Sequence, residues 1–172
     1  DIPHATLLDL DKGRSGGGWG RIKTTCAQLL ANGIVTPEAL FEEELPAEGP
    51  DAALTSFDGR INDDSLAAWA KRLRKFGVFF STPLDLDWSM LAAFPGAYCT
   101  LEGGATGPST TGDAKTAVLG DAGDVELYGT TEDEKFRWYR YLFLGRSKPT
   151  THLRVLSSLN NEEIGIHAPE EL

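Results

Sequence analysis

The chain has 172 residues, with 16 Lys and Arg against 26 Asp and Glu and a formal net charge of -10. This length suits one domain, or a core with one insertion, since domains commonly contain roughly 100–200 residues. A hydrophobic fraction of 41% allows a buried core and argues against general disorder. The acidity excludes a protein that holds nucleic acid by bulk positive charge alone, although divalent metal can offset carboxylates locally.

The sequence gives no sign of a membrane span or of a secretory signal. Its apolar runs stay well short of the roughly 18–20 residues that a spanning helix needs. The chain starts at Asp1 and its only methionine is Met90, so we expect a piece of a longer protein. Cys26 and Cys99 cannot set up a disulfide framework, and we expect both to be buried thiols in a reducing cytoplasm.

The first elements follow the pattern of an α/β protein. An apolar run that ends in acids, at 5–11, predicts a buried strand with carboxylates at its C-terminal end. A glycine-rich loop occupies 12–20, and the apolar spacing of 21–32 predicts a helix that ends at Gly33. The segment 36–59 predicts a short helix at its start and a surface loop.

A helix, a strand and another helix are predicted next. Polar residues at 62–65 offer N-caps for a helix over 66–76. The run 78–81 predicts a second buried strand. Pro83 suits a first helical position, so we expect a helix from Pro83 to Ala93.

The last third of the chain reads as mainly helical. A loop covers 103–112, the segment 114–120 suits a few helical residues or a short strand, and 125–128 is too short to classify. Helices are predicted over 131–144 and 150–159. The order of elements predicts an α/β fold with a mainly parallel sheet flanked by helices, and its sites beyond the C-terminal strand ends.

Acidic residues follow both predicted strands. Asp9 and Asp11 are two positions apart, so on a strand both side chains leave the same face. Two carboxylates held so close favour a hard cation such as Mg²⁺ or Mn²⁺, although a solvated acidic pair fits equally well. Asp85 suits a helix cap that also leans towards this pair, whereas Asp87 is a weaker candidate because it lies further into the helix.

Basic residues of two kinds complete the candidate site. Lys115 follows a loop, and a lysine beside metal-bound phosphate would neutralise charge in the transition state, although a single loop lysine is usually only solvated. Cations around the glycine-rich loop are candidates to contact a phosphate backbone: Lys12, Arg14, Arg21 and Lys23. The aromatic run over 136–143 is more typical of a core than of a base-stacking surface.

Three segments resemble the C-terminal nuclease region of the OLD (overcoming lysogenization defect) family. They are VFFSTPLDLDWSMLAAFPGAY at 78–98, LLDLDKGRSGGGWGR at 7–21 and KTAVLG at 115–120. The resemblance implies a Toprim domain with helical additions, placed after an ABC-type ATPase domain in the full protein. It also implies metal-dependent endonuclease cleavage of DNA phosphodiesters.

The resemblance assigns roles residue by residue. Asp9 and Asp11 would be the Toprim metal ligands for two Mg²⁺ or Mn²⁺ ions. Asp85 would be a further metal-binding and catalytic acid, and Lys115 the catalytic lysine. The implied partners are a DNA substrate and the N-terminal ATPase domain, no membrane is implied, and a homodimer is compatible with it.

One departure from the family pattern concerns a glutamate. The Toprim pattern also has a Glu on an earlier strand, and no such strand precedes Ala5; the ATPase motifs are absent too. We therefore divide the chain into a Toprim core at 1–35, a helical and loop insertion at 36–76, the remaining core with Lys115 at 77–149, and a C-terminal helix and tail at 150–172.

Two alternative functions use the same residues. A HAD-type phosphohydrolase would take Asp9 as its nucleophile, with further groups from Asp11, Ser81, Lys115, Asp121 and Asp124. In a non-enzymatic acidic interaction module, both acidic pairs would be helix caps or surface residues. Trapped phosphoaspartate at Asp9 would favour the first alternative, and metal binding unchanged by loss of Asp9 and Asp11 would favour the second.

Overall fold

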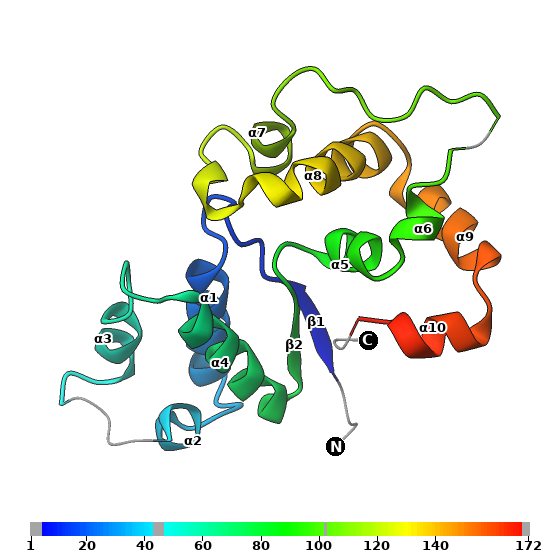
Figure 1. Cartoon of the computed structure of the whole chain (residues 1–172). Helices are drawn as coiled ribbons and strands as arrows, with labels where there is room; N and C mark the ends of the chain where they lie inside the picture. Colours follow the sequence, from blue (N-terminus) through cyan, green and yellow to red (C-terminus); the bar gives the residue numbers. More distant parts are fainter. Residues whose placement is uncertain (1–4, 43–46, 102, 170–172) are drawn as a thin grey trace.

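Two parallel strands lie between two groups of helices (Figure 1). The computed structural model describes residues 5–42, 47–101 and 103–169. Strand β1 (Thr6–Asp9) pairs in parallel with β2 (Val78–Ser81), so that Asp9 lies opposite Ser81. The predicted α/β class and parallel pairing are confirmed, but within the described residues the sheet has two strands, which is less than the mainly parallel sheet that we expected.

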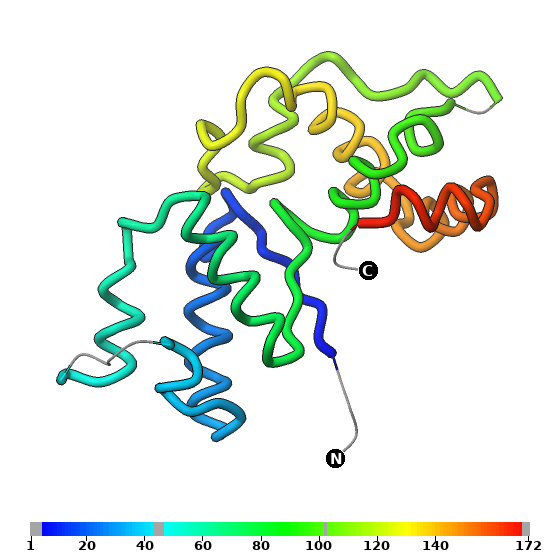
Figure 2. Tube along the Cα trace, turned by 60° about the horizontal axis from the view of Figure 1, so that its bottom comes forward, coloured from blue at the N-terminus to red at the C-terminus, as the bar shows by residue number. Residues whose placement is uncertain are grey.

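The helices that follow β1 and precede β2 in the sequence form a first lobe beside the two strands (Figure 2). This lobe consists of α1 (Trp19–Ala31), α2 (Pro37–Phe41), α3 (Pro50–Thr55), α4 (Asp63–Leu73) and the 3₁₀ turn η1 (Arg74–Phe76). Helix α4 begins at Asp63, three residues before the predicted start at Leu66, because Asn62 is the N-cap and its side chain accepts a hydrogen bond from the Ser65 amide. The turn ends at Gly77, whose backbone is left-handed.

The rest of the chain forms a second lobe, which is helical. Its elements are α5 (Leu86–Ala93), α6 (Pro95–Tyr98), α7 (Ala114–Leu119), η2 (Val125–Leu127), η3 (Thr130–Glu132), α8 (Asp133–Tyr139), the π-helical turn η4 (Arg140–Leu144), α9 (Lys148–Ser158) and α10 (Asn161–His167). The segment 114–120 is therefore helical rather than a strand, and the helix expected over 131–144 is a composite of three helical forms.

Helix α5 starts three residues later than the sequence suggests. Pro83 does not occupy its first turn, because Asp85 is the N-cap and its carboxylate accepts a hydrogen bond from the Trp88 amide. The residues between Ser81 and Asp85 thus form a separate connection from β2, in which the Thr82–Pro83 peptide bond is cis. This connection brings Asp85 to the end of the sheet.

Each lobe has its own hydrophobic core. The first contains Ile22, Leu40, Leu54, Leu73 and Phe80, so the predicted insertion at 36–76 shares a core with α1 and β2. The second core is built from α5 to α9 and includes Leu84, Trp88, Tyr98, Tyr139 and Val155. The domain boundaries set from the sequence stay predictions. Across the described ranges, every helix is too short or too polar to cross a membrane.

Candidate functional site

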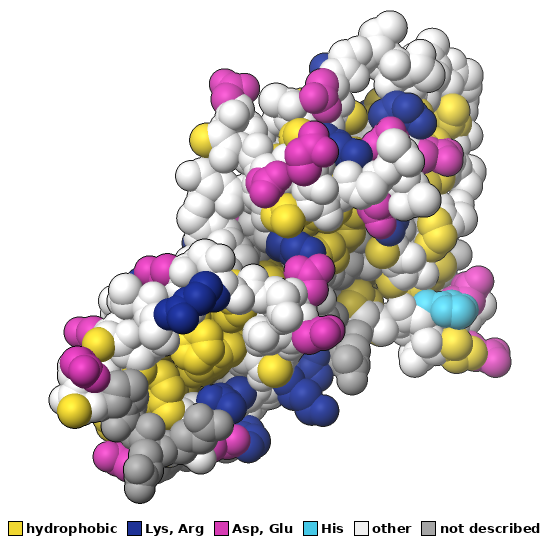
Figure 3. Space-filling view, turned by 60° about the vertical axis from the view of Figure 1, so that its left-hand side comes forward, with side chains coloured by type: hydrophobic (Ala, Val, Ile, Leu, Met, Phe, Trp, Pro, Cys, Tyr) yellow, Lys and Arg dark blue, Asp and Glu magenta, His cyan; other side chains and the backbone are white. Residues whose placement is uncertain are grey.

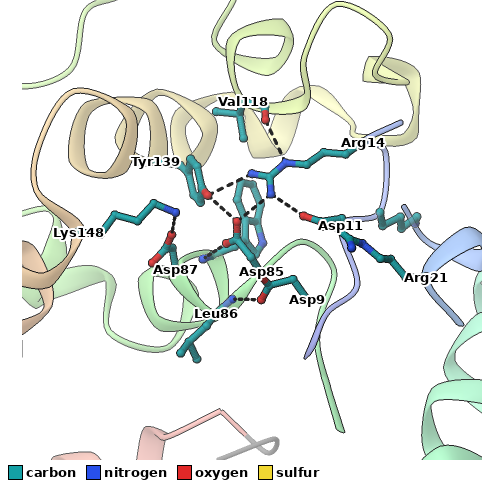
Figure 4. Close-up of polar contacts among 12 residues, drawn as sticks. Asp9, Asp11, Arg14, Arg21, Asp85, Leu86, Asp87, Val118, Tyr139 and Lys148 are labelled. Atoms are coloured by element: carbon teal, nitrogen blue, oxygen red, sulfur yellow. Dashed lines mark hydrogen bonds and ion pairs between the residues drawn. The ribbon is translucent and has the colours of Figure 1, made fainter. Parts of the chain in front are cut away.

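Three acidic residues lie near the ends of the two strands (Figure 4). Asp9 is the last residue of β1, and its Oδ1 accepts a hydrogen bond from the Leu86 amide at the start of α5, at 3.3 Å. Asp11 does not share the strand face of Asp9 as predicted, because β1 has already ended and Asp11 has a left-handed backbone with φ 53°. Asp85 arrives from the other strand as the cap of α5.

The glycine-rich loop folds tightly back onto the end of β1. The Gly18 amide donates to the Leu10 carbonyl at 2.7 Å, and the Gly17 amide donates to the Arg14 carbonyl at 2.9 Å. A Cβ at Gly17 would lie 1.8 Å from the Asp11 carbonyl oxygen, so the loop can take this path only with glycine there. The tight fold turns Arg14 back towards Asp11.

Arg14 is the centre of the site. Its Nη1 donates to Asp11 Oδ1 at 2.5 Å and to Asp85 Oδ2 at 3.1 Å. Its Nη2 donates to the Tyr139 hydroxyl and its Nε to the Val118 carbonyl, both at 3.2 Å. One side chain from the first lobe therefore binds three groups that belong to the second lobe or its entry, as the dashed lines in Figure 4 show.

Tyr139 binds the Asp85 oxygen that does not cap α5. Its hydroxyl is buried and donates to Asp85 Oδ2 at 2.6 Å, while Asp85 Oδ1 remains bound to the Trp88 amide. Burial, the charge of Asp85 and the hydrogen bond to it raise the pKa of Tyr139 far above its ordinary value. The dual behaviour predicted for Asp85, a helix cap that leans towards the first acidic pair, is confirmed.

Asp9 and Asp11 differ in the groups that bind their carboxylates. Asp11 is 5% exposed, and its Oδ2 accepts a hydrogen bond from Arg21 at 2.5 Å, so both of its oxygens bind guanidinium groups. Asp9 has the backbone bond to Leu86 as its hydrogen-bond partner. Burial first, and then the charges of Asp85, Asp11 and Asp87, raise the pKa of Asp9 above its ordinary value.

Asp9 also borders a groove of about 450 Å³ between β1 and α1. The groove is lined by Asp9, Arg21, Gly16, Gly20 and residues of both elements. Beside Asp9 in the sheet register, the hydroxyl of Ser81 is fully buried and has no hydrogen-bond partner among the described residues. A buried hydroxyl without a protein partner is a group that an ordered water can satisfy.

The four predicted DNA-contacting cations all have acidic partners in this chain. Arg14 and Arg21 bind Asp11, as described, and Lys12 pairs with Asp63 at 2.7 Å. Lys23 pairs with Asp58 at 2.6 Å. Their contact with DNA stays a prediction, and it would require phosphates to compete with these carboxylates.

Lys115 binds groups other than the three acidic residues at the strand ends. Its ammonium donates to the carbonyls of Tyr128 at 2.9 Å and Gly129 at 3.0 Å, and it pairs with Asp133 at 2.7 Å. These three partners match the three donors of an ammonium group. The lysine lines a second pocket of about 520 Å³. Among the described side chains it has no contact with Asp9, Asp11 or Asp85, and its catalytic role stays a prediction.

Asp87 belongs to a separate buried network. Its carboxylate binds Lys148 and accepts a hydrogen bond from His152 Nε2 at 2.8 Å, and His152 Nδ1 lies 2.5 Å from the Tyr98 hydroxyl. Burial works against the charge of Asp87, but the hydrogen bonds from His152 and Lys148 outweigh it and lower the pKa of Asp87. This network ties α5, α6 and α9 together, which agrees with Asp87 being the weaker site candidate.

The acidic residues offer the type of donor atom that a hard divalent cation prefers, but too few of them are grouped together. Carboxylate and hydroxyl oxygens are the donors that Mg²⁺ and Mn²⁺ prefer, and Asp9 and Ser81 offer oxygens without strong partners. Across the described part of the chain, however, no three Asp, Glu, His or Cys side chains are grouped closely enough to hold a metal. Mg²⁺ is often bound by one or two carboxylates together with water and substrate phosphates. Asp9 and Ser81 fit an ion that is bound in this way.

Comparison with models of known protein families, with curated proteins and with solved structures finds no match to this chain. The functional argument therefore depends on the residues themselves. Sequence reasoning missed Tyr139 as a partner of the site. The signal was its hydroxyl inside a predicted aromatic core, since a buried tyrosine hydroxyl needs a hydrogen-bond partner.

Proposed function

We propose that this chain is the catalytic part of a metal-dependent DNA endonuclease, which hydrolyses phosphodiesters at Asp9, Asp11 and Asp85. The observation that carries the proposal is the environment of Asp9. Its carboxylate borders an open groove, and its pKa is raised by burial and by neighbouring acids. A divalent cation between these carboxylates would relieve their repulsion.

Each nearby side chain has a role in this proposal. Asp9, with Asp11 and Asp85, would hold the Mg²⁺ or Mn²⁺ ions, which polarise a phosphoryl oxygen and lower the pKa of bound water. Arg14 and Tyr139 position Asp85 by binding its Oδ2. Arg21 lines the groove and would exchange its bond to Asp11 for a bond to a substrate phosphate.

Lys115 is retained as the residue that stabilises charge in the transition state. For this role its ammonium would have to leave Asp133 and the two carbonyls that it now binds. Two substitutions separate the charge of Lys115 from its present bonds. Lys115→Arg would keep a cation at this position. Lys115→Met would remove both the charge and the bonds to Asp133 and the two carbonyls.

The edge of β1 that faces away from β2 supports the Toprim and OLD-family part of the proposal, because no other strand of the described residues pairs with it. The Thr6 and Leu10 amides donate to Gly77 and Ser81 on the β2 side. Alternate residues of a parallel strand face opposite edges, so the backbone groups of Leu7 and Asp9 face away from β2. We propose that a strand from the part of the full protein that carries the ATPase domain pairs there and supplies the family's glutamate. A cytoplasmic location and a homodimer belong to the same proposal.

The experiment is a nicking assay on supercoiled plasmid with Mg²⁺ or Mn²⁺, using the full-length protein. Asp9→Asn and Asp11→Asn should each lower the rate by about 100-fold or more, the usual cost of losing one group that stabilises the transition state. Asp51→Asn removes an exposed acid from α3 and serves as the matched control. Undiminished cutting by the Asp9→Asn Asp11→Asn double variant would overturn the proposal.

One observation favours the phosphohydrolase alternative, namely that Asp9 lies opposite the unpartnered hydroxyl of Ser81. In that case the Asp9 carboxylate would attack the phosphorus of a phosphomonoester, the P–O bond to the alcohol would break as the alcohol leaves, and water would then hydrolyse the phosphoaspartate. Mass spectrometry after incubation with a phosphomonoester and Mg²⁺ distinguishes the two reactions, because a nuclease leaves Asp9 unmodified. Mn²⁺ binding that is the same in the wild type and the double variant would favour the acidic interaction module instead.

A further inference from the structure

A pocket of about 420 Å³ lies on the outer side of α8 and η4, away from Arg14 and Asp85. Three of its lining residues are arginines, Arg137, Arg140 and Arg146, and the others are Ser109, Tyr141, Leu144 and Gly145. The pocket lining contains no acidic residue. In a chain with a formal net charge of -10, three arginines that line one pocket without a carboxylate are an unusual concentration of positive charge.

These arginines differ from the cations around the glycine-rich loop. Lys12, Arg14, Arg21 and Lys23 each bind a carboxylate. The described residues provide no such ion pair for Arg137, Arg140 or Arg146. Two acids that are close to these arginines in sequence are already engaged: Asp133 binds Lys115, and Asp113 accepts two hydrogen bonds from Thr116.

The walls of the pocket are held by defined contacts. Tyr141 packs edge-on against Trp138, with ring centroids 5.8 Å apart. Arg146 stacks over the Tyr141 ring at 4.2 Å and donates to its hydroxyl at 2.5 Å. A Cβ at Gly112 would lie 3.2 Å from Arg140 Nη1, so the segment before α7 packs closely against Arg140.

Neighbouring residues at the junction of α8 and η4 differ in exposure. Tyr139 ends α8 and is fully buried towards Asp85, whereas Arg140, which follows it, is exposed at the start of η4. Short π-helical turns in α-helices frequently occur at functional sites. The same helical segment therefore has the candidate acidic site on its inner side and the arginine pocket on its outer side.

We propose that Arg137, Arg140 and Arg146 form a binding pocket for a phosphate group. Guanidinium groups present planar pairs of donors that match phosphate oxygens, and several of them around one pocket compensate a dianion. The bound phosphate belongs either to a nucleic-acid backbone or to a free phosphate compound; both share this chemistry. The proposal does not depend on nuclease activity at Asp9.

The test compares binding of two probes to the full chain at low salt. One probe is a fluorescein-labelled DNA duplex, measured by fluorescence anisotropy, and the other is inorganic pyrophosphate, measured by isothermal titration calorimetry. Arg137→Gln and Arg140→Gln should each weaken binding by about tenfold, the usual effect of losing one charge-assisted hydrogen bond. Arg60→Gln removes the same charge from an exposed position in the first lobe and should change affinity less than twofold.

The pattern of results identifies the source of the phosphate. Arginine-dependent binding of the duplex that pyrophosphate competes away supports a nucleic-acid backbone as the ligand. Arginine-dependent binding of pyrophosphate, with duplex binding equal in all variants, supports a free phosphate compound. Binding of both probes that is unchanged by Arg137→Gln and Arg140→Gln, or no binding of either probe, overturns the proposal. Circular dichroism of each variant verifies that the helices are intact.

Discussion

The two lobes bury their aromatic side chains in different ways. In the first lobe, Trp19, Phe41, Phe57 and Trp69 pack on one another with ring centroids 5.4–5.8 Å apart. In the second lobe, three buried tyrosine hydroxyls bind polar groups: Tyr139 binds Asp85, Tyr128 binds the Lys12 carbonyl and Tyr98 lies against His152. Figure 3 shows the lobes as two bulges. A pocket formed by residues from both parts of the chain is lined in part by Lys12, Asp63 and Leu127.

This difference shows how the candidate site is assembled. The first lobe provides a scaffold of apolar contacts and projects the glycine-rich loop from it. The second lobe uses a core that is both apolar and hydrogen-bonded, so the packing of its rings also decides where charged groups lie. Four substitutions test this contrast, in order of decreasing expected effect.

The largest effect should come from Phe136→Ala in the second core. Phe136 is fully buried, with ring centroids 4.6 Å from Trp88 and 5.0 Å from Tyr128. Removing such a ring should lower the free energy of unfolding by about 4 kcal/mol, because a cavity remains. Urea denaturation followed by circular dichroism measures this loss. Phe57→Ala, at a half-buried ring of the first lobe, should cost about half as much, and equal losses would contradict the contrast.

Asp87→Asn should come second, with a loss of about 2 kcal/mol at pH 7, because Lys148 and His152 lose a charged partner. The pKa of Asp87 is lowered in the folded protein, so its stabilisation is complete above the ordinary pKa near 4 and disappears as the pH falls through the lowered value. Unfolding curves of wild type and variant should therefore converge in acid. A difference that persists unchanged at pH 2 would contradict this assignment. Asp51→Asn provides the matched control.

Tyr139→Phe should have a smaller effect on stability, about 1 kcal/mol, because the ring remains and a single hydroxyl is lost. This hydroxyl both donates to Asp85 and accepts from Arg14, so two charged groups lose a partner. The control is Tyr141→Phe, at a tyrosine whose hydroxyl binds the exposed Arg146. Thermal unfolding should rank Tyr139→Phe as the more damaging of the two, and the reverse order would show that the hydroxyl of Tyr139 is not needed.

The smallest effect, and the only stabilising one, is expected for Asp9→Asn. The raised pKa of Asp9 means that its ionised form is disfavoured in the folded protein. The cost is therefore present above its ordinary pKa and fades as the pH falls and Asp9 is protonated. Without added metal, the variant should have a melting temperature about 1–2 °C higher at pH 7, since partial exposure screens the repulsion. Calorimetry at pH 7 and pH 3 measures the difference, which should vanish at pH 3.

Part of this architecture could be predicted from local patterns. Strand β2 has the bounds that its apolar run indicates, and α4 begins where Asn62 caps it. Both features depend on neighbouring residues, which is why the sequence reveals them. Asp85 was predictable as a cap for the same reason, but the first residue of α5 was not, because the connection after β2 is set by its packing against Lys12 and Asp11.

The centre of the site was harder to predict because its contacts join distant parts of the chain. The spacing of Asp11 and Arg14 hints at a local ion pair, whereas nothing near Arg14 in the sequence points to Tyr139 or Val118. The role of Lys115 was assigned from a segment pattern, and its bonds to Tyr128 and Asp133 arise from a loop geometry that the pattern does not contain.

The bonds of Arg14 also concern how the protein folds. They close sequence separations of 71, 104 and 125 residues, to Asp85, Val118 and Tyr139. Contacts between such distant residues have a higher loop-closure entropy than contacts within a helix, so we expect them to form after the local helices. The acidic centre should accordingly become ordered late in refolding, together with the pairing of β1 and β2, which joins similarly distant residues.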